Sequence, residues 1–226
     1  MDATAFDHVA LWVDQRVALE TLITQVSGMH EIERTDSFTL LGGDARRGKI
    51  TLFDAEGPRE QGCLHRVTIR VPEISDCRAR LEALTTPVVE DASGEICFLA
   101  PGGVPLGLVE GRGEPDLHSI VLTVQDPAGT AEELRRMGFT GDREGLALGG
   151  RFVALRAGSP ARTERPLLNH LALLVDSAEG ARREAEVLGL EIDRFVDAAN
   201  TIAVFVMGPE GILVEYVEHK PSFSLV

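Results

Sequence analysis

The sequence predicts an α+β fold built from four copies of one small module. The first observation is a recurrence: a histidine opens a short apolar segment four times, at intervals of 52 to 57 residues. The second is that a helical pattern and then two or more short apolar segments follow it. A similar pattern that recurs at a nearly fixed interval indicates that one structural unit was duplicated. Each copy then buries its apolar face against another copy. The four histidines are His8, His65, His118 and His170.

Each repeat begins with a predicted strand. The four segments are short, rich in valine, isoleucine and leucine, and bounded by aspartate, proline or glutamine, which is typical of strands in a sheet. In the second and third repeats the histidine shares a face with apolar residues, because strand side chains alternate. The predicted strands are His8–Val13, His65–Val71, His118–Val124 and His170–Val175.

A predicted helix follows each of these strands. In the first repeat Leu19, Leu22, Ile23 and Val26 have helical spacing, and Gly28 stands where a left-handed residue ends a helix. The other three predicted helices also begin or end at residues that are typical of helix caps. They are Ile74–Leu84, a third helix capped by Asp126-Pro127 and closed by Gly138, and a fourth capped by Asp176 or Ser177 and closed by Gly189.

Short apolar segments separated by turn residues complete each repeat, so each is predicted to be βαβββ. Glycine-rich turns such as Gly42-Gly43 and Gly149-Gly150 indicate hairpin-like connections. The segment Gly111–Pro115 is the best candidate linker. We therefore expect two domains, residues 1–112 and 113–226, each made of two consecutive repeats.

Bulk properties exclude several classes of function. A net charge of −14 disfavours binding to nucleic acid or to an anionic membrane surface. Three cysteines, Cys63, Cys77 and Cys97, show no CxxC pairing, which argues against a disulfide framework and a thiolate zinc site. No stretch approaches the ~20 apolar residues of a membrane helix. We expect a cytoplasmic protein with reduced thiols.

At this point the sequence resembles the vicinal oxygen chelate superfamily, whose βαβββ members include glyoxalase I, extradiol dioxygenases and bleomycin-resistance proteins. The two most specific passages are the strand that starts at Leu168-Asn169-His170 and the final Gly208–Tyr216 segment. The resemblance covers residues 6–218. It implies that paired modules form cup-like, curved mixed sheets with helices outside, and that a divalent metal lies on a cup floor, held by residues of first and last strands.

Carried over to this chain, the resemblance implies a metal site made of His118, His170 and Glu215. Two imidazoles and one carboxylate suit non-haem Fe(II), and Mn(II), Co(II), Ni(II) or Zn(II) are alternatives. Glu215 has independent support, since a carboxylate on an apolar strand is costly to bury without a cation or donors. Glyoxalase I usually adds a fourth protein ligand, but the corresponding stretch Arg151–Arg156 offers none. We expect three protein ligands.

The first half lacks a matching carboxylate. Alignment through the turn glycines places Gly107 opposite the Glu215 position and Glu110 opposite Glu218. We therefore expect residues 1–112 to be a structural domain with a degenerate site, in which His8 and His65 are relics. A lone histidine on an apolar strand is usually a half-buried residue bonded to the backbone, and this alternative applies to both.

Several remaining residues are expected to have no part in the site. His30 follows a helix end and His219 belongs to a C-terminal tail, so neither is predicted to bind metal. Tyr216, the only tyrosine, should face away from Glu215 and serve packing. The sequence identifies no acid or base.

The function implied by the resemblance is an extradiol-type ring-cleaving dioxygenase that acts on a catechol-like small molecule with vicinal oxygens. One alternative is a glyoxalase- or epimerase-type isomerase or lyase, which needs no O2. Another is a non-enzymatic, bleomycin-resistance-like binder, which the acidic charge would suit. Exposed sheet edges make a homodimer plausible.

Overall fold

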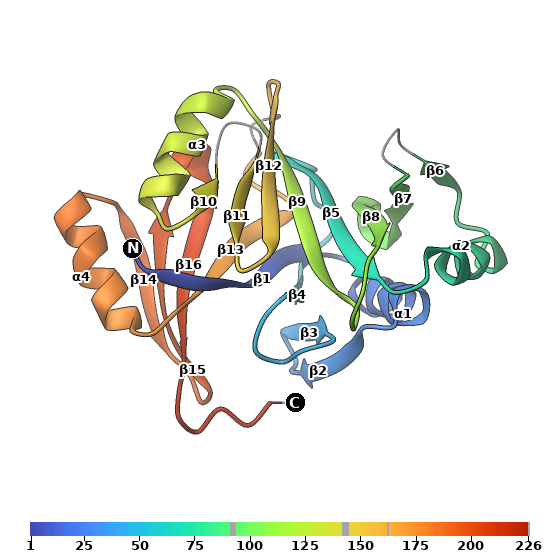
Figure 1. Cartoon of the computed structure of the whole chain (residues 1–226), viewed down its shortest axis with the longest axis horizontal. Coiled ribbons are helices and arrows are strands. Elements are labelled where there is room, and N and C mark those ends of the chain that lie inside the picture. The colour runs from blue at the N-terminus through green and yellow to red at the C-terminus, as the bar shows by residue number, and fades with distance from the viewer. Residues whose placement is uncertain (91–93, 142–144, 162, 226) are drawn as a thin grey trace.

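The computed structural model describes residues 1–90, 94–141, 145–161 and 163–225, and it confirms the predicted fold class. Four βαβββ modules follow one another along the chain (Figure 1). In the first two modules the strands are β1 (Ala3–Val13), β2 (His30–Arg34), β3 (Phe38–Gly42), β4 (Lys49–Asp54), β5 (Leu64–Val71), β6 (Val88–Glu90), β7 (Ile96–Ala100) and β8 (Val104–Glu110). In the last two they are β9 (Asp116–Val124), β10 (Thr140–Gly141), β11 (Leu146–Leu148), β12 (Arg151–Ala157), β13 (Leu168–Val175), β14 (Ile192–Asp197), β15 (Thr201–Met207) and β16 (Leu213–His219).

One α-helix follows the first strand of each module. The helices are α1 (Arg16–Ser27), α2 (Ile74–Ala83), α3 (Pro127–Arg136) and α4 (Ala178–Leu188). The predicted caps of the last two are confirmed: the side chains of Asp126 and Ser177 each accept a hydrogen bond from a backbone N–H in the first turn, at 3.0 Å. Helices α1 and α2 lie together at one end of the molecule, and α3 and α4 at the other (Figure 1).

The strands form two eight-stranded mixed sheets, which do not follow the expected division at residue 112. The first sheet has the order β14-β15-β16-β13-β1-β4-β3-β2 and joins module one to module four. The second sheet, β10-β11-β12-β9-β5-β8-β7-β6, joins modules two and three. Each sheet thus takes one module from either half of the chain.

The pairing of modules is a correction to the sequence-based expectation, and its physical reason is plain. The first strand of every module pairs in parallel with the last strand of the same module and leaves its other edge open. That open edge pairs antiparallel with the equivalent edge of another module, β1 with β13 and β5 with β9. Neighbours in sequence are usually neighbours in space, but four similar edges do not reveal which two meet.

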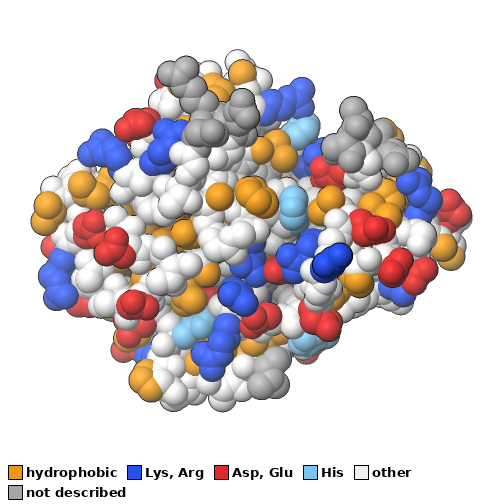
Figure 2. Space-filling model, viewed as in Figure 1, with side chains coloured by type: hydrophobic (Ala, Val, Ile, Leu, Met, Phe, Trp, Pro, Cys, Tyr) orange, Lys and Arg blue, Asp and Glu red, His pale blue; other side chains and the backbone are white. Residues whose placement is uncertain are grey.

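The larger of the two hydrophobic clusters among the described residues contains residues of all four modules. Tyr216, fully buried, donates a hydrogen bond of 2.7 Å to the carbonyl oxygen of Met137 and so ties module four to module three. This confirms its predicted packing role. On the face that Figure 2 shows, acidic and basic side chains are interspersed. Among the helices of the described residues, none combines the length and hydrophobicity needed to cross a membrane.

Candidate metal centre

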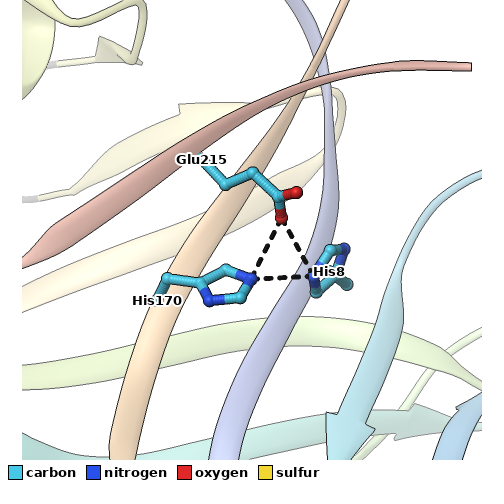
Figure 3. A group of neighbouring side chains, drawn as sticks. All are labelled: His8, His170 and Glu215. Atoms are coloured by element: carbon cyan, nitrogen blue, oxygen red, sulfur yellow. Dashed lines mark hydrogen bonds and ion pairs between the residues drawn. The ribbon is translucent and has the colours of Figure 1, made fainter. Parts of the chain in front are cut away.

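Two histidines and one glutamate from three neighbouring strands of the first sheet point toward one another (Figure 3). The Nε2 atoms of His8 and His170 are 3.1 Å apart. Oε2 of Glu215 lies 3.3 Å from His8 Nε2 and 3.0 Å from His170 Nε2. Three potential ligand atoms therefore meet at one point.

Strand register places these side chains on one face of the sheet. In the antiparallel β1–β13 pair, His8 is opposite Ala172; in the parallel β13–β16 pair, Ala172 is opposite Glu215. His8 and Glu215 thus stand on either side of Ala172, a residue with a side chain too small to separate them. His170 precedes Ala172 by two positions and shares its face, because strand side chains alternate with period two.

The cluster is almost completely buried. The side chains of His8, His170 and Glu215 are 12%, 3% and 9% exposed. Burial lowers the pKa of His170, partly opposed by Glu215. Burial by itself would raise the pKa of Glu215, but the adjacent imidazoles of His170 and His8 hold it below its ordinary value. A neutral imidazole beside an ionised carboxylate is the protonation state that binds a metal ion.

Both histidines are oriented by the residue that precedes them. Nδ1 of His8 lies 2.7 Å from Oδ1 of Asp7, and Nδ1 of His170 lies 3.0 Å from Oδ1 of Asn169. Each oxygen is an acceptor, so each Nδ1 carries the proton and donates, and the Nε2 lone pair is directed at the centre. Such outer partners fix ring orientation and tautomer at metal sites.

The geometry of the three atoms fits a divalent cation. Ligand atoms about 2.1 Å from a metal and at right angles to one another are about 3 Å apart, close to the observed separations. Oε2 of Glu215 is buried and has no hydrogen-bond partner. Lone pairs of two imidazoles and a carboxylate repel at these distances unless a proton or a metal cation lies between them, and a metal cation would satisfy all three at once. His8, His170 and Glu215 would hold it as a facial set with open positions.

The position that could supply a fourth protein ligand carries Thr51. In the β1–β4 pair Thr51 is opposite Ala10, two residues after His8, just as Glu215 is opposite Ala172 in module four. Its hydroxyl is buried without a hydrogen-bond partner. The cluster thus contains two histidines and one carboxylate, and the strand at the position of a fourth ligand is β4 and not β12.

His118, which we expected in the metal site, lies elsewhere. It belongs to β9 of the second sheet, its ring centroid is 5.4 Å from that of Phe152, and it is outside the cluster. His8, which we expected to be a relic, takes its place. The cause is the pairing of module one with module four, which brings β1 and not β9 alongside β13.

The second sheet has no comparable set of ligands among the described residues. His65 contacts Arg156, with Nη1 3.0 Å from its Nε2. Gly107, predicted to lack the carboxylate, pairs with Thr68, and a Cβ on it would be 2.2 Å from Oε1 of Glu95. Glu95 in turn forms a 2.7 Å ion pair with Arg66. A salt bridge thus fills this part of the second sheet.

His8 and the outer residues Asp7 and Asn169 were not predicted to belong to the site, although the sequence contains a signal for them. An aspartate or asparagine precedes the histidine only in the first and fourth repeats, whereas leucine precedes His65 and His118. The two repeats that share the oriented histidine are the two that pair.

A cavity of about 340 Å³ opens beside the cluster. All three candidate ligands line it, together with four phenylalanine side chains, which give it apolar and aromatic walls: Phe38, Phe53, Phe205 and Phe223. Its ionisable residues besides the ligands are Asp7, Glu33, Lys49 and His219. A cavity of this size accommodates a small organic molecule.

Solved structures share this fold. A protein of Bacillus subtilis subsp. subtilis str. 168, provisionally assigned as a dioxygenase, superposes with a TM-score of 0.80 at 18% identity, over 98% of this chain and 87% of that one. Glyoxalase I of Zea mays gives 0.74 at 14% identity, over 95% and 92%. The cppA protein of Streptococcus pneumoniae TIGR4 gives 0.64 at 13%, over 96% and 100%.

No protein-family model and no curated protein matches the sequence. The resemblance predicted from the sequence is therefore confirmed at the level of the fold. At identities this low, the activity of the chain has to be argued from its own site.

Proposed function

We propose that this chain is a metal-dependent enzyme that binds a small molecule through two neighbouring oxygens, and that it cleaves a catechol-type ring with O2. The observation that carries the proposal is the convergence of His8, His170 and Glu215 beside an aromatic-walled cavity. Two histidines and one carboxylate with open positions are typical of non-haem Fe(II) oxygenases. Fe(II) is the metal we expect, with Mn(II) as the nearest substitute.

The bound ion would supply Lewis acidity to the two substrate oxygens and the means to activate O2. The protein supplies the rest. Asp7 and Asn169 fix the two imidazoles, and the phenylalanine walls suit the faces of a planar ring and exclude water from it. In ring cleavage, both atoms of O2 enter the product, so no external reductant is required.

The test is anaerobic titration with Fe(II) or Mn(II), followed by oxygen uptake on a panel of catechols. We expect one metal per chain and O2 consumption equal to the ring-opened product formed. His8→Ala, His170→Ala and Glu215→Gln should each lose metal and activity, whereas His118→Ala, a histidine on the equivalent strand of the second sheet, should keep both.

Two outcomes point to the other functions. Activity under argon with Ni(II), Co(II) or Zn(II), on a substrate whose atoms are only rearranged, would replace the dioxygenase by an isomerase of the same site. A wild-type protein that takes up no metal under these conditions would remove the enzymatic proposal.

A further inference from the structure

One histidine in the cavity is left over once the candidate ligands are assigned. His219 ends β16, and Glu215, Val217 and His219 alternate along the strand, so all three line the cavity. Its side chain is 9% exposed. From the sequence we expect His219 to lie in a C-terminal tail and not to bind metal. The structure instead places it beside the candidate metal centre.

Two groups hold the His219 ring from different sides. Its Nε2 atom lies 2.8 Å from Oδ2 of Asp7. Phe223, which follows β16 in the C-terminal tail, stacks on the ring with centroids 4.2 Å apart and an interplanar angle of 16°. The ring of Phe223 is in turn covered by cations, Lys49 Nζ at 5.9 Å and the Arg46 guanidinium at 5.2 Å.

The carboxylate of Asp7 contacts two further groups besides His219. Its Oδ1 lies 2.9 Å from Nζ of Lys49 and 2.7 Å from Nδ1 of His8. Because a carboxylate oxygen accepts and does not donate, the 2.8 Å contact with Asp7 favours the His219 tautomer that has its proton on Nε2 and its lone pair on Nδ1.

We propose that His219 is the base that removes a proton from a substrate hydroxyl in this cavity, and that Phe223 positions it. This inference rests on the proposed function. The O–H bond of the substrate breaks, an N–H bond forms at Nδ1, and the imidazole becomes an imidazolium while the substrate oxygen keeps the electron pair. Asp7 stabilises the new cation across the 2.8 Å contact and keeps its own charge.

The other ionisable residues of the cavity are less suited to the task. Lys49 is 3% exposed, and its amino group is engaged by two acceptors, Asp7 and the carbonyl oxygen of Ala45. Asp7 has its oxygens engaged by three partners. Glu33, on β2, is the remaining alternative and supplies the matched control.

The charges that surround His219 come from four elements. Asp7 belongs to β1 and Lys49 to β4, Arg46 lies on the loop before β4 and covers Phe223, and Glu215 is on β16 itself. Removing the imidazole leaves this set unchanged. A difference in the titration of the bound probe between the wild type and a His219 variant therefore reports the effect of the imidazole itself.

The experiment uses the full chain loaded anaerobically with Fe(II) and the chromophore 4-nitrocatechol, whose visible spectrum depends on how many of its hydroxyls are ionised. No turnover is needed. The spectrum of the bound probe is titrated against pH in the wild type and in His219→Gln, Phe223→Ala, Phe223→Tyr and Glu33→Gln. Metal content is measured in each.

We expect His219→Gln to keep its metal and to raise the pH at which bound nitrocatechol loses its last proton by at least about one unit. Phe223→Ala should shift this midpoint in the same direction by less, and Phe223→Tyr, which keeps the stacked ring, should restore it. Glu33→Gln should resemble the wild type.

The inference is overturned if His219→Gln titrates like the wild type with full metal content, or if Glu33→Gln produces the shift instead. Failure of the proposed function looks different: wild-type protein that binds neither Fe(II) nor nitrocatechol overturns both. Loss of metal from His219→Gln would make His219 part of the metal site and so also contradict its assignment as a base.

Discussion

Replacing Asp7 by asparagine tests how this residue contributes to the stability of the protein and to the metal affinity of the candidate centre. Asp7 is 1% exposed and its carboxylate contacts Lys49, His8 and His219. The variant leaves the Lys49 ammonium buried at 3% exposure without its counter-ion. Breaking a buried pair in this way costs about 3–5 kcal/mol. This is a large share of the roughly 5–15 kcal/mol by which native proteins are stable.

The same substitution also weakens the orientation of His8. Loss of an outer partner of a ligating histidine costs about 10–100-fold in metal affinity. Asn169→Ala is the matched control, because it removes the equivalent 3.0 Å contact to His170 but involves no buried charge. Its metal affinity should fall by a similar factor, while its stability falls by only about 0.5–1.5 kcal/mol.

The assays are urea unfolding of the metal-free protein and competitive metal titration with a chelator. The reasoning is refuted if Asp7→Asn binds metal as tightly as the wild type, or if its free energy of unfolding is no lower than that of Asn169→Ala.

The lowered pKa of Asp7 also predicts that the stability of the metal-free protein depends on pH. Because its folded pKa lies below the unfolded value, its contribution to stability is fully present above about pH 4 and is lost as the pH falls toward the folded pKa. The difference in unfolding free energy between wild type and Asp7→Asn should therefore be constant near neutral pH and shrink in acid. A difference that grew on acidification would contradict this assignment.

Three further substitutions test individual contacts. Thr51→Val removes a buried hydroxyl without a partner, so the metal-free protein should gain about 1 kcal/mol in urea unfolding and metal content should not change. Tyr216→Phe deletes the 2.7 Å bond to Met137 and should cost about 1–3 kcal/mol, measured in the same way. Gly107→Ala places a methyl group against Glu95 and should lower the melting temperature while metal affinity is retained, since the second sheet holds no part of the site.

Much of the fold could be predicted from the sequence because the signals are local and repeated. The alternation in the first strands, the caps at Asp126 and Ser177 and the turn glycines each depend on near neighbours in the chain. His170 and Glu215 could be predicted for the same reason, since β13 and β16 belong to one module and pair in parallel.

The third member of the cluster could not be predicted in this way. Whether His8 or His118 approaches His170 depends on which open strand edge pairs with β13. That pairing is determined by tertiary packing between segments far apart in the chain, since His8 and His170 are separated by 162 residues. The role that we propose for His219 could not be predicted for a similar reason. Its partner Asp7 is at the other end of the sequence, and only the first sheet brings the two together.

Metal content of two variants tests the central claim most directly. His8→Ala and His118→Ala each remove one histidine from the first strand of a module, in different sheets. After anaerobic loading with Fe(II) and removal of excess metal, elemental analysis should find one ion per chain in the wild type and in His118→Ala, and none in His8→Ala. Metal lost from His118→Ala and kept by His8→Ala would contradict the account.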